Sequence, residues 1–427
     1  MLASKLVSSS CTSSNRHRLS CSVAIQRDAV DNSTPLASRM SVPRPFPSWF
    51  EDAFGFRESS YDETKQTLME MKASSSDPET KLRWLGNADQ PVEVTFGPFS
   101  LHSVKDYREE CTRLMQLLLQ QQQQQQASPP DSESETVNHR YANRITWQNI
   151  RASVLDLHAD PANAGAIFQA ASQFNCLEMI SPSVTPEAGI TCYCQDPTQG
   201  PACAIACGPG TAYRNYLIEF PNDGHVGQTS NRQINTLDPI LERLADNNNG
   251  EKTNITVKNG YAKASNQNLA ALHGIVRHHT EELIELLQVG VQRNTEVTHP
   301  IRTGRLVTQV YCSAVPVSYT LATAVEWAPL ARVVLQGAYE ATLLEGVFQH
   351  LYKQLERPGE TIGPTKIYLT MVGGGAFGNE MEWIWDAMER AHNAIRLYHP
   401  VALEIYIVHY GDIHPGATDV VSRIHKS

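Results

Sequence analysis

A glycine-rich run near the C-terminus is the part of the sequence best suited to hold an anion. It lies between an apolar run at 366–372, which predicts a buried strand, and a helical pattern at 380–397. Glycines let backbone N–H groups approach a ligand without a Cβ in the way, and a helix N-terminus adds partial positive charge. We therefore expect a diphosphate to bind at the residues of this run, which are Gly373, Gly374, Gly375, Ala376, Phe377, Gly378 and Asn379.

Three interpretations of this run compete. A Walker A loop is excluded because no Gly-Lys-Ser/Thr follows. Gly373, Gly375 and Gly378 satisfy the Rossmann pattern G-x-G-x-x-G. That pattern opens the first βαβ unit of its fold, however, whereas only one more strand is predicted here before the chain ends. The remaining alternative is a tight turn whose glycines serve close packing.

A second group of polar side chains lies at 169–216. Arg214 follows a Gly-Pro-Gly turn, and it could pair bidentately with a phosphate or a carboxylate. If the protein is a hydrolase, we expect Glu178 to be the general base that activates a water beside Asn175. The alternative for each of these residues is a structural role, such as a carboxylate that caps a loop.

The cysteines do not indicate a metal site. Cys192 and Cys194 are spaced as C-x-C, and Cys203 and Cys207 as C-x₃-C, which is poor spacing for a structural zinc ion. Alternation of apolar residues predicts strands at both pairs, with free thiols that fill small gaps in the core. The sequence contains neither an H-E-x-x-H nor a G-x-S-x-G pattern. We expect neither a metal nor a cofactor.

Composition and charge narrow the class of protein. The formal net charge of −10 argues against non-specific binding to DNA or RNA, which depends on a basic surface. No apolar run is long enough to cross a bilayer, so we expect no membrane partner. Cys is present 9 times, an odd count in a chain without a clear signal peptide. This usage indicates reduced thiols and an intracellular location, cytoplasmic or organellar. The sequence names no protein partner.

The segments that must position these residues alternate between strand and helix patterns. Apolar runs predict strands at 153–158, 203–207, 213–220, 306–317, 366–372 and 403–409. Helical periods predict helices at 104–120, 269–287, 330–351 and 380–397. Residues 164–179 have helical or loop-helix character. The alternation predicts an α/β fold with a mixed, mostly parallel sheet covered by helices on both faces.

Composition divides the chain into five segments. Residues 1–44 are serine-rich and begin without any acidic residue, so we expect a disordered or organellar targeting segment. Residues 45–119 are expected to form an α+β segment that packs its many aromatic side chains on the body. A glutamine tract opens a low-complexity loop at 120–140. The α/β body then spans 141–411, and 412–427 form a tail.

The C-terminal part, KIYLTMVGGGAFGNEMEWIWDAMERA followed by LEIYIVHYG, resembles the end of macro domains and of the related poly(ADP-ribose) glycohydrolases. In that superfamily a strand runs into a glycine-aromatic-glycine loop, a helix and a final strand, and the loop holds the phosphates of ADP-ribose. The resemblance extends over about 150–411 and implies a macro-domain-like fold. The motifs FQ-x-ASQFN-x-LEM and GGGAFGN are similar to those of a branch of this superfamily to which no activity is attached.

Upstream, the stretch VLDLHADPANAGAIFQAASQFNCLEM is similar in layout to the first ligand-binding stretch of that superfamily. The resemblance implies that Asp156, or else Asp160, contacts adenine and that Asn175 approaches the distal ribose. Two departures from the superfamily pattern bear on a hydrolytic mechanism. QAASQFN stands where the superfamily has NAAN, and the GGGV-x-G-x-x-x-QEE run that supplies the paired glutamates of the glycohydrolases is missing.

Three functions therefore compete. The first is binding of a small-molecule nucleotide ligand, ADP-ribose or an ADP-ribosylated substrate, through the glycine-rich run, with hydrolysis of the ADP-ribosyl linkage if the protein is an enzyme. The second is a non-catalytic reader or scaffold that uses the same run. The third is an enzyme of different specificity that acts through 169–215.

Overall fold

The central sheet has seven strands and is mixed. The computed structural model describes residues 48–84, 86, 92–126, 144–247 and 253–426. The expected segment at 1–44 and the part 127–140 of the expected loop at 120–140 lie outside these residues. The strand order is β3 (Phe99–Ser103), β10 (Gln288–Glu296), β11 (Leu306–Cys312), β5 (Ile167–Ala171), β12 (Thr365–Leu369), β13 (Ala402–His409) and β4 (Arg144–Arg151). The strands from β11 to β4 run parallel, and β10 is antiparallel to both of its neighbours.

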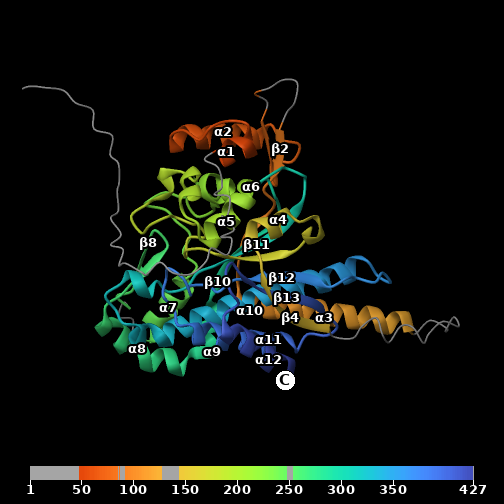
Figure 1. Cartoon of the computed structure of the whole chain (residues 1–427), viewed down its shortest axis with the longest axis vertical. Helices are drawn as coiled ribbons and strands as arrows, with labels where there is room; N and C mark the ends of the chain where they lie inside the picture. Colours follow the sequence, from red (N-terminus) through yellow and green to blue (C-terminus); the bar gives the residue numbers. More distant parts are fainter. Residues whose placement is uncertain (1–47, 85, 87–91, 127–143, 248–252, 427) are drawn as a thin grey trace, which may run out of the picture. The chain divides into compact units, whose positions relative to one another are not determined.

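Helices cover the sheet on both faces (Figure 1). One face carries α3 (Val104–Gln126), α10 (Ala324–Glu356), α11 (Met381–Ile395) and α12 (Pro415–Lys426). The other face carries α4 (Val154–Ala159), α5 (Gln199–Ala206) and α6 (Gly208–Ala212). The predicted fold class, a mixed and mostly parallel sheet between two helical layers, is confirmed. None of the described helices combines the length and the apolar character that a membrane span requires.

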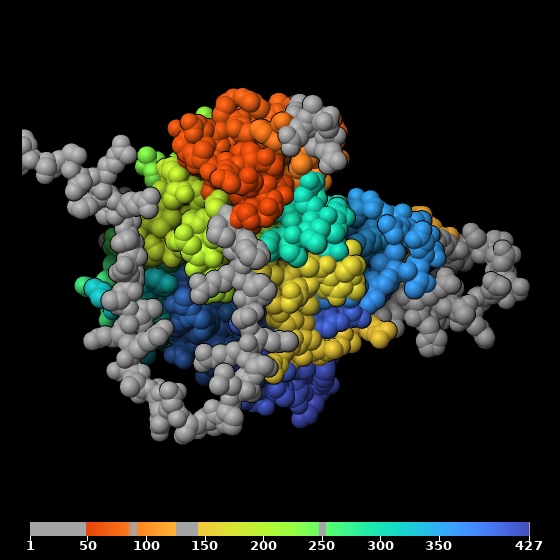
Figure 2. Space-filling model, turned by 45° about the horizontal axis from the view of Figure 1, so that its top comes forward, coloured from red at the N-terminus to blue at the C-terminus, as the bar shows by residue number. Residues whose placement is uncertain are grey.

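The first described segment packs an aromatic cluster onto residues from the middle of the chain. It comprises α1 (Trp49–Phe54), α2 (Tyr61–Ala73) and a hairpin of β1 (Lys81–Trp84) with β2 (Val92–Thr95). Its buried aromatic side chains contact buried residues between Leu177 and Leu217. Figure 2 shows this segment, in red and orange, against the yellow-green surface of that region.

The remaining elements form a long insertion between β5 and β10. They are β6 (Glu219–Phe220), β7 (His225–Val226), α7 (Asp238–Asn247), β8 (Thr256–Lys258), β9 (Tyr261–Lys263), α8 (Asn266–His278) and α9 (Thr280–Leu286). β6 pairs with β7 and β8 pairs with β9, each as an antiparallel hairpin. The predicted helix at 269–287 is confirmed, with a break at His279 between α8 and α9.

Several predicted strands are wrong. Residues 153–158 lie in α4 and its N-cap, 203–207 lie mostly in α5, and most of 213–220 is a π-helical turn, Tyr213–Leu217. The expected helical character of 164–179 is also wrong, because this stretch contains β5. α5 is buried on nearly all sides, so its apolar residues show no helical period. The glutamine tract, predicted to open a loop, instead continues α3 to Gln126.

Helix α10 is the main element of the helical layer that also contains α3, α11 and α12. It begins at an N-cap, Thr323, whose hydroxyl accepts a hydrogen bond from the N–H of Glu326 at 3.3 Å. Most of its side chains are buried, which a helix can sustain only at the centre of a core. The buried set includes two carboxylates, Glu340 and Glu345.

Both carboxylates of α10 are paired with arginines from other elements. Glu345 accepts two hydrogen bonds from Arg293 of β10, each at 2.7 Å, and one from the hydroxyl of Tyr107 at 2.7 Å. Glu340 accepts one from Arg108 of α3 at 2.6 Å and another from Arg390 of α11. These ion pairs connect α10 to β10, α3 and α11.

We predict that Glu345→Gln lowers the free energy of unfolding by about 3 kcal/mol, because removal of one partner leaves the largely buried Arg293 without its carboxylate. Urea denaturation of the two proteins measures the difference. The matched control is Glu110→Gln, which breaks an exposed pair with Arg113 and should cost less than about 1 kcal/mol. Equal effects of the two substitutions would contradict the assignment of Glu345 as a structural ion pair.

Candidate functional site

The carboxyl ends of three adjacent parallel strands form the edge at which polar loops meet. β11, β5 and β12 are neighbours, and the chain leaves them at Cys312, Ala171 and Leu369. The N–H of Ser172 donates to the carbonyl of Cys312 at 2.9 Å, so the segments after β5 and β11 stay together beyond the sheet. In open α/β sheets, ligands bind in the crevice outside the carboxyl ends of the strands.

The glycine loop, defined as Gly373–Asn379, is tied to the segment that follows β11. The N–H of Ser318 donates to the carbonyl of Phe377 at 3.0 Å, and the Asn379 amide donates to the carbonyl of Val315 at 2.8 Å. The N–H of Asn379 also donates to the carbonyl of Gly373 at 2.9 Å, which closes the loop on itself. Asn379 is buried, so its amide holds the loop and does not face solvent.

The glycines of the loop differ in what they are needed for. Gly373 and Gly378 have φ of +75° and +70°, and a Cβ on Gly378 would lie 2.0 Å from the hydroxyl oxygen of Ser318. A Cβ on Gly374 would meet the end of the Ile384 side chain at 2.9 Å. Gly375 is exposed and has open space around it. Tight packing therefore explains Gly373, Gly374 and Gly378 but not Gly375.

Backbone donors are unused at the open part of the glycine loop. The N–H groups of Gly375, Ala376 and Phe377 have no acceptor among the residues that the structure describes. Gly375 and Ala376 are exposed, and α11 begins shortly after them at Met381. Free N–H groups beside a helix N-terminus attract anions such as phosphate.

Three aromatic rings stand beside the glycine loop. Phe377 of the loop lies 5.4 Å from the ring of Tyr261 and 5.7 Å from that of Tyr319, and the two tyrosine rings are 5.5 Å apart. Tyr319 is 43% exposed, whereas Tyr261 is buried and donates its hydroxyl to the carbonyl of Met179 at 3.2 Å. An accessible ring next to a phosphate-type loop could stack on a base or a sugar.

Sequence reasoning missed Tyr261 and Tyr319, although one signal pointed to the first. Tyr261 follows Asn259 and Gly260, whose φ values of +50° and +74° form the turn between β8 and β9. Asn-Gly is the strongest short-range sign of a hairpin. The carbonyl of Gly260 accepts a hydrogen bond from the N–H of Phe174 at 3.0 Å, which fixes the hairpin against the segment after β5.

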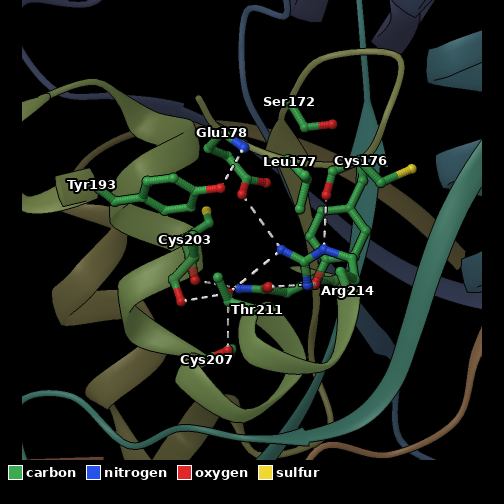
Figure 3. A network of polar contacts seen from close by, with 12 residues as sticks. Ser172, Cys176, Leu177, Glu178, Tyr193, Cys203, Cys207, Thr211 and Arg214 are labelled. Atoms are coloured by element: carbon green, nitrogen blue, oxygen red, sulfur yellow. Dashed lines mark hydrogen bonds and ion pairs between the residues drawn. The ribbon is translucent and has the colours of Figure 1, made fainter. Parts of the chain in front are cut away.

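A second polar cluster lies inside the protein around Arg214 (Figure 3). Its guanidinium donates to the carbonyl of Cys176 at 2.8 Å, to the hydroxyl of Tyr311, and to the carboxylate of Glu178 at 3.5 Å. The side chain of Arg214 is 0% exposed, so its guanidinium does not face solvent. The carboxylate that pairs with Arg214 is therefore that of Glu178 in this chain.

Glu178 is an incompletely paired carboxylate in this cluster. Its side chain is 1% exposed, and its Oε1 has no hydrogen-bond partner among the described residues. Burial raises the pKa of Glu178 from 4.5 to about 7, against the opposing effect of the neighbouring Arg214. A carboxyl group with such a pKa has the acidity of a general base or acid that works near neutral pH.

The other predicted site residues lie in different surroundings. Asn175 is buried, donates its amide to Gln233 at 3.0 Å and accepts from the N–H of Leu177 at 3.1 Å. Asp156 is exposed on α4, and no contact of the described residues joins it to the glycine loop. The structure thus brings Asn175, Glu178 and Arg214 into one buried region, whereas the glycine loop is a separate and partly exposed segment.

The cysteines do not lie on strands, which corrects the prediction. Cys192 and Cys194 belong to a 3₁₀ helix, Thr191–Gln195, while Cys203 and Cys207 lie in and directly after α5. All four are free thiols. Among the described residues, no group of His, Cys, Asp and Glu is arranged to hold a metal ion.

Comparison with known proteins gives matches among solved structures. No family model and no curated protein matches the chain. A poly(ADP-ribose) glycohydrolase from Thermomonospora curvata is similar at 12% identity with a TM-score of 0.34, covering 85% of this chain and 97% of that one. The Deinococcus radiodurans enzyme in complex with ADP-ribose is similar at 9% identity with a TM-score of 0.34, covering 77% of this chain and 94% of that one. A similarity this distant says nothing about the site residues of this chain.

The glycine loop yields a stability prediction. Gly378→Ala should lower the free energy of unfolding by more than about 1 kcal/mol, because it combines a left-handed φ with a collision against Ser318. Gly375→Ala, its matched control, meets no atom and should be neutral or slightly stabilising. Thermal unfolding of both variants measures this contrast. A stable Gly378→Ala protein would show that the loop geometry is not as described.

The raised pKa of Glu178 yields a pH dependence with a definite sign. Between about pH 5 and 7 the folded chain holds a proton on Glu178 that the unfolded chain releases, so the free energy of unfolding falls as the pH rises. The loss is complete above pH 7 and amounts to about 3 kcal/mol. Urea denaturation at several pH values should show this fall in the natural protein and not in Glu178→Gln. Glu109→Gln, which changes an exposed carboxylate, should keep the pH profile of the natural protein. If Glu178→Gln also keeps that profile, the assignment is refuted.

Proposed function

We propose that this protein binds a nucleotide diphosphate of the ADP-ribose type at the carboxyl edge of β11, β5 and β12. The observation that carries the proposal is the unused donors of Gly375, Ala376 and Phe377, at an exposed loop that precedes α11. Tight packing explains the neighbouring glycines, but it leaves Gly375 without a structural reason. Close approach of a ligand to its backbone supplies one.

The chemistry of the loop favours a diphosphate over a carboxylate or a simple sugar. Several unused N–H groups and a helix N-terminus supply donors and partial positive charge without a basic side chain in the loop. This explains how a chain with a formal net charge of −10 could hold an anion. The rings of Phe377 and Tyr319 offer apolar faces beside the same donors. Stacking of a base on such a ring contributes about 1–3 kcal/mol.

Hydrolysis of an ADP-ribosyl linkage is a second candidate function, and one observation favours it. Glu178 carries a raised pKa and an unpaired Oε1 on the segment that follows β5. In the reaction, this carboxylate would accept a proton from the water that attacks the anomeric carbon. The bond from that carbon to the acceptor would break, and the acceptor would leave after taking up a proton from solvent. Glu178 is buried, so water reaches it only if the segment after β5 moves. Asn175, three residues before it, would then help to place that water, and Asp156 would contact adenine as the exposed acid of α4.

Arg214 has a supporting part in this proposal. It is buried and its guanidinium is shared among Cys176, Tyr311 and Glu178. We assign it the role of setting the position and charge of Glu178, with no direct contact to the phosphates. A protein that binds ligand but does not turn it over would instead be a reader that uses the same loop.

The test is calorimetric titration of the full chain with ADP-ribose, alongside AMP, NAD and inorganic diphosphate. We expect saturable binding of ADP-ribose that Gly375→Glu loses, because the new carboxylate enters the open space beside the donors and repels the phosphates. Gly375→Ala should still bind, since a methyl group meets no atom there.

The matched control for charge is Gly363→Glu, which places the same side chain in open space at the opposite end of β12. It should bind ADP-ribose like the natural protein. Absence of ADP-ribose binding by the folded natural chain would refute the proposal. If binding is found, the next assay is release of free ADP-ribose from an ADP-ribosylated peptide. Release that Glu178→Gln abolishes would indicate a hydrolase, and no release would indicate a reader.

A further inference from the structure

A groove of about 560 Å³ runs along the outer surface of α10, between the end of α8 and the start of α11. Its lining includes the apolar residues Val276, Ala328 and Val333, which are called the apolar floor below. Arg277 and Arg332 also line it. This volume falls in the range of pockets that hold small organic molecules.

Small side chains on α10 keep the groove open. Ala324 and Ala328 stand one helical turn apart on the groove side, and Pro329 lies next to them. Ala328 and Pro329 are only partly buried, so this stripe faces the groove and is not covered by a neighbouring helix. Val325, 75% exposed, extends the apolar surface at the mouth.

Positive charge at the groove is not fully balanced. Arg277 is exposed at the end of α8, and no acidic residue in the described part of the chain pairs with it. Arg332 donates to Asp386 at 2.6 Å and lies 5.8 Å above the ring of Trp383. Glu380 is the acidic residue of the lining.

Two helix N-termini add to the positive charge at the groove. The first turn of α10 lines the groove through Ala324 and Val325, and Glu380 of the lining occupies the N-cap position of α11 without a side-chain capping hydrogen bond. The two helices run the same way because each connects parallel strands, so both positive ends point to this edge of the sheet. The unpaired guanidinium of Arg277 and these dipoles favour a negatively charged group over an apolar floor.

We infer that this groove binds an amphipathic organic anion, a carboxylate or sulfonate carried on an apolar body. The head group pairs with Arg277 and the apolar body covers Val276, Ala328 and Val333. The site is separate from the glycine loop, although Glu380 directly follows Asn379 of that loop. The inference therefore stands whether or not the chain binds a nucleotide.

The probe is decanoate, with decanol and decyltrimethylammonium as neutral and cationic probes of the same chain length. Calorimetric titration of the full chain below the micelle concentrations should show saturable binding of one decanoate. Decanol should bind about tenfold more weakly and the cation not at all. Equal affinities for decanoate and decanol, or no saturable decanoate binding, would overturn the inference.

Two substitutions locate the site. Arg277→Gln should weaken decanoate binding about tenfold and leave decanol binding unchanged, because it removes the charge and keeps the floor. Arg396→Gln, which removes an exposed arginine just beyond the end of α11, should change neither. Ala328→Phe should block both probes by filling the groove. Unchanged decanoate affinity in Arg277→Gln would overturn the inference, because Arg277 would then not hold the head group, whatever the effect of Ala328→Phe.

Discussion

The pairing of two buried carboxylates on α10 is the constraint on which the rest of the structure depends. A charge inside a core is tolerated only if partners satisfy it, and removal of one partner costs several kcal/mol. Glu345 therefore requires Arg293 of β10, and Glu340 requires Arg108 of α3 and Arg390 of α11. These pairs fix one strand and two helices relative to α10. The edge strand β3 follows, since it pairs with β10 and leads directly into α3.

With α10 and α11 fixed in this way, both helix N-termini lie at the carboxyl edge of the sheet. The glycine loop enters α11 there, and the segment after β11 enters α10. The loop and that segment are joined by the hydrogen bonds of Asn379 and Ser318. The unused N–H groups of the glycine loop and the groove on α10 therefore depend on the same feature. That feature is the parallel arrangement of β11, β5 and β12, which makes the crossover helices α10 and α11 run the same way.

The sequence predicted the elements whose apolar residues recur with a clear period. It did not predict those that are buried on nearly all sides. The helices near 330–351 and 380–397 have long repeating apolar faces, so only their ends differ from the prediction. The residues of α5 are small and buried on nearly all sides, and nothing in their order separates a helix from a strand. The glycine loop could be found because its chemistry belongs to the backbone. The burial of Arg214 could not, because its partners Glu178 and Tyr311 lie far from it in the sequence.

Tyr261 makes the contact that relates the open loop to the buried cluster. Its ring touches Phe377 of the glycine loop, and its hydroxyl donates to the carbonyl of Met179, the residue after Glu178. A ligand that displaced the ring of Phe377 would disturb Tyr261, and the hydrogen bond to Met179 would carry that disturbance to the segment holding Glu178. Binding at the surface and exposure of a buried carboxyl would then be one event. If Tyr261 stayed in place, Glu178 would remain buried, and the proposed binding would occur without hydrolysis.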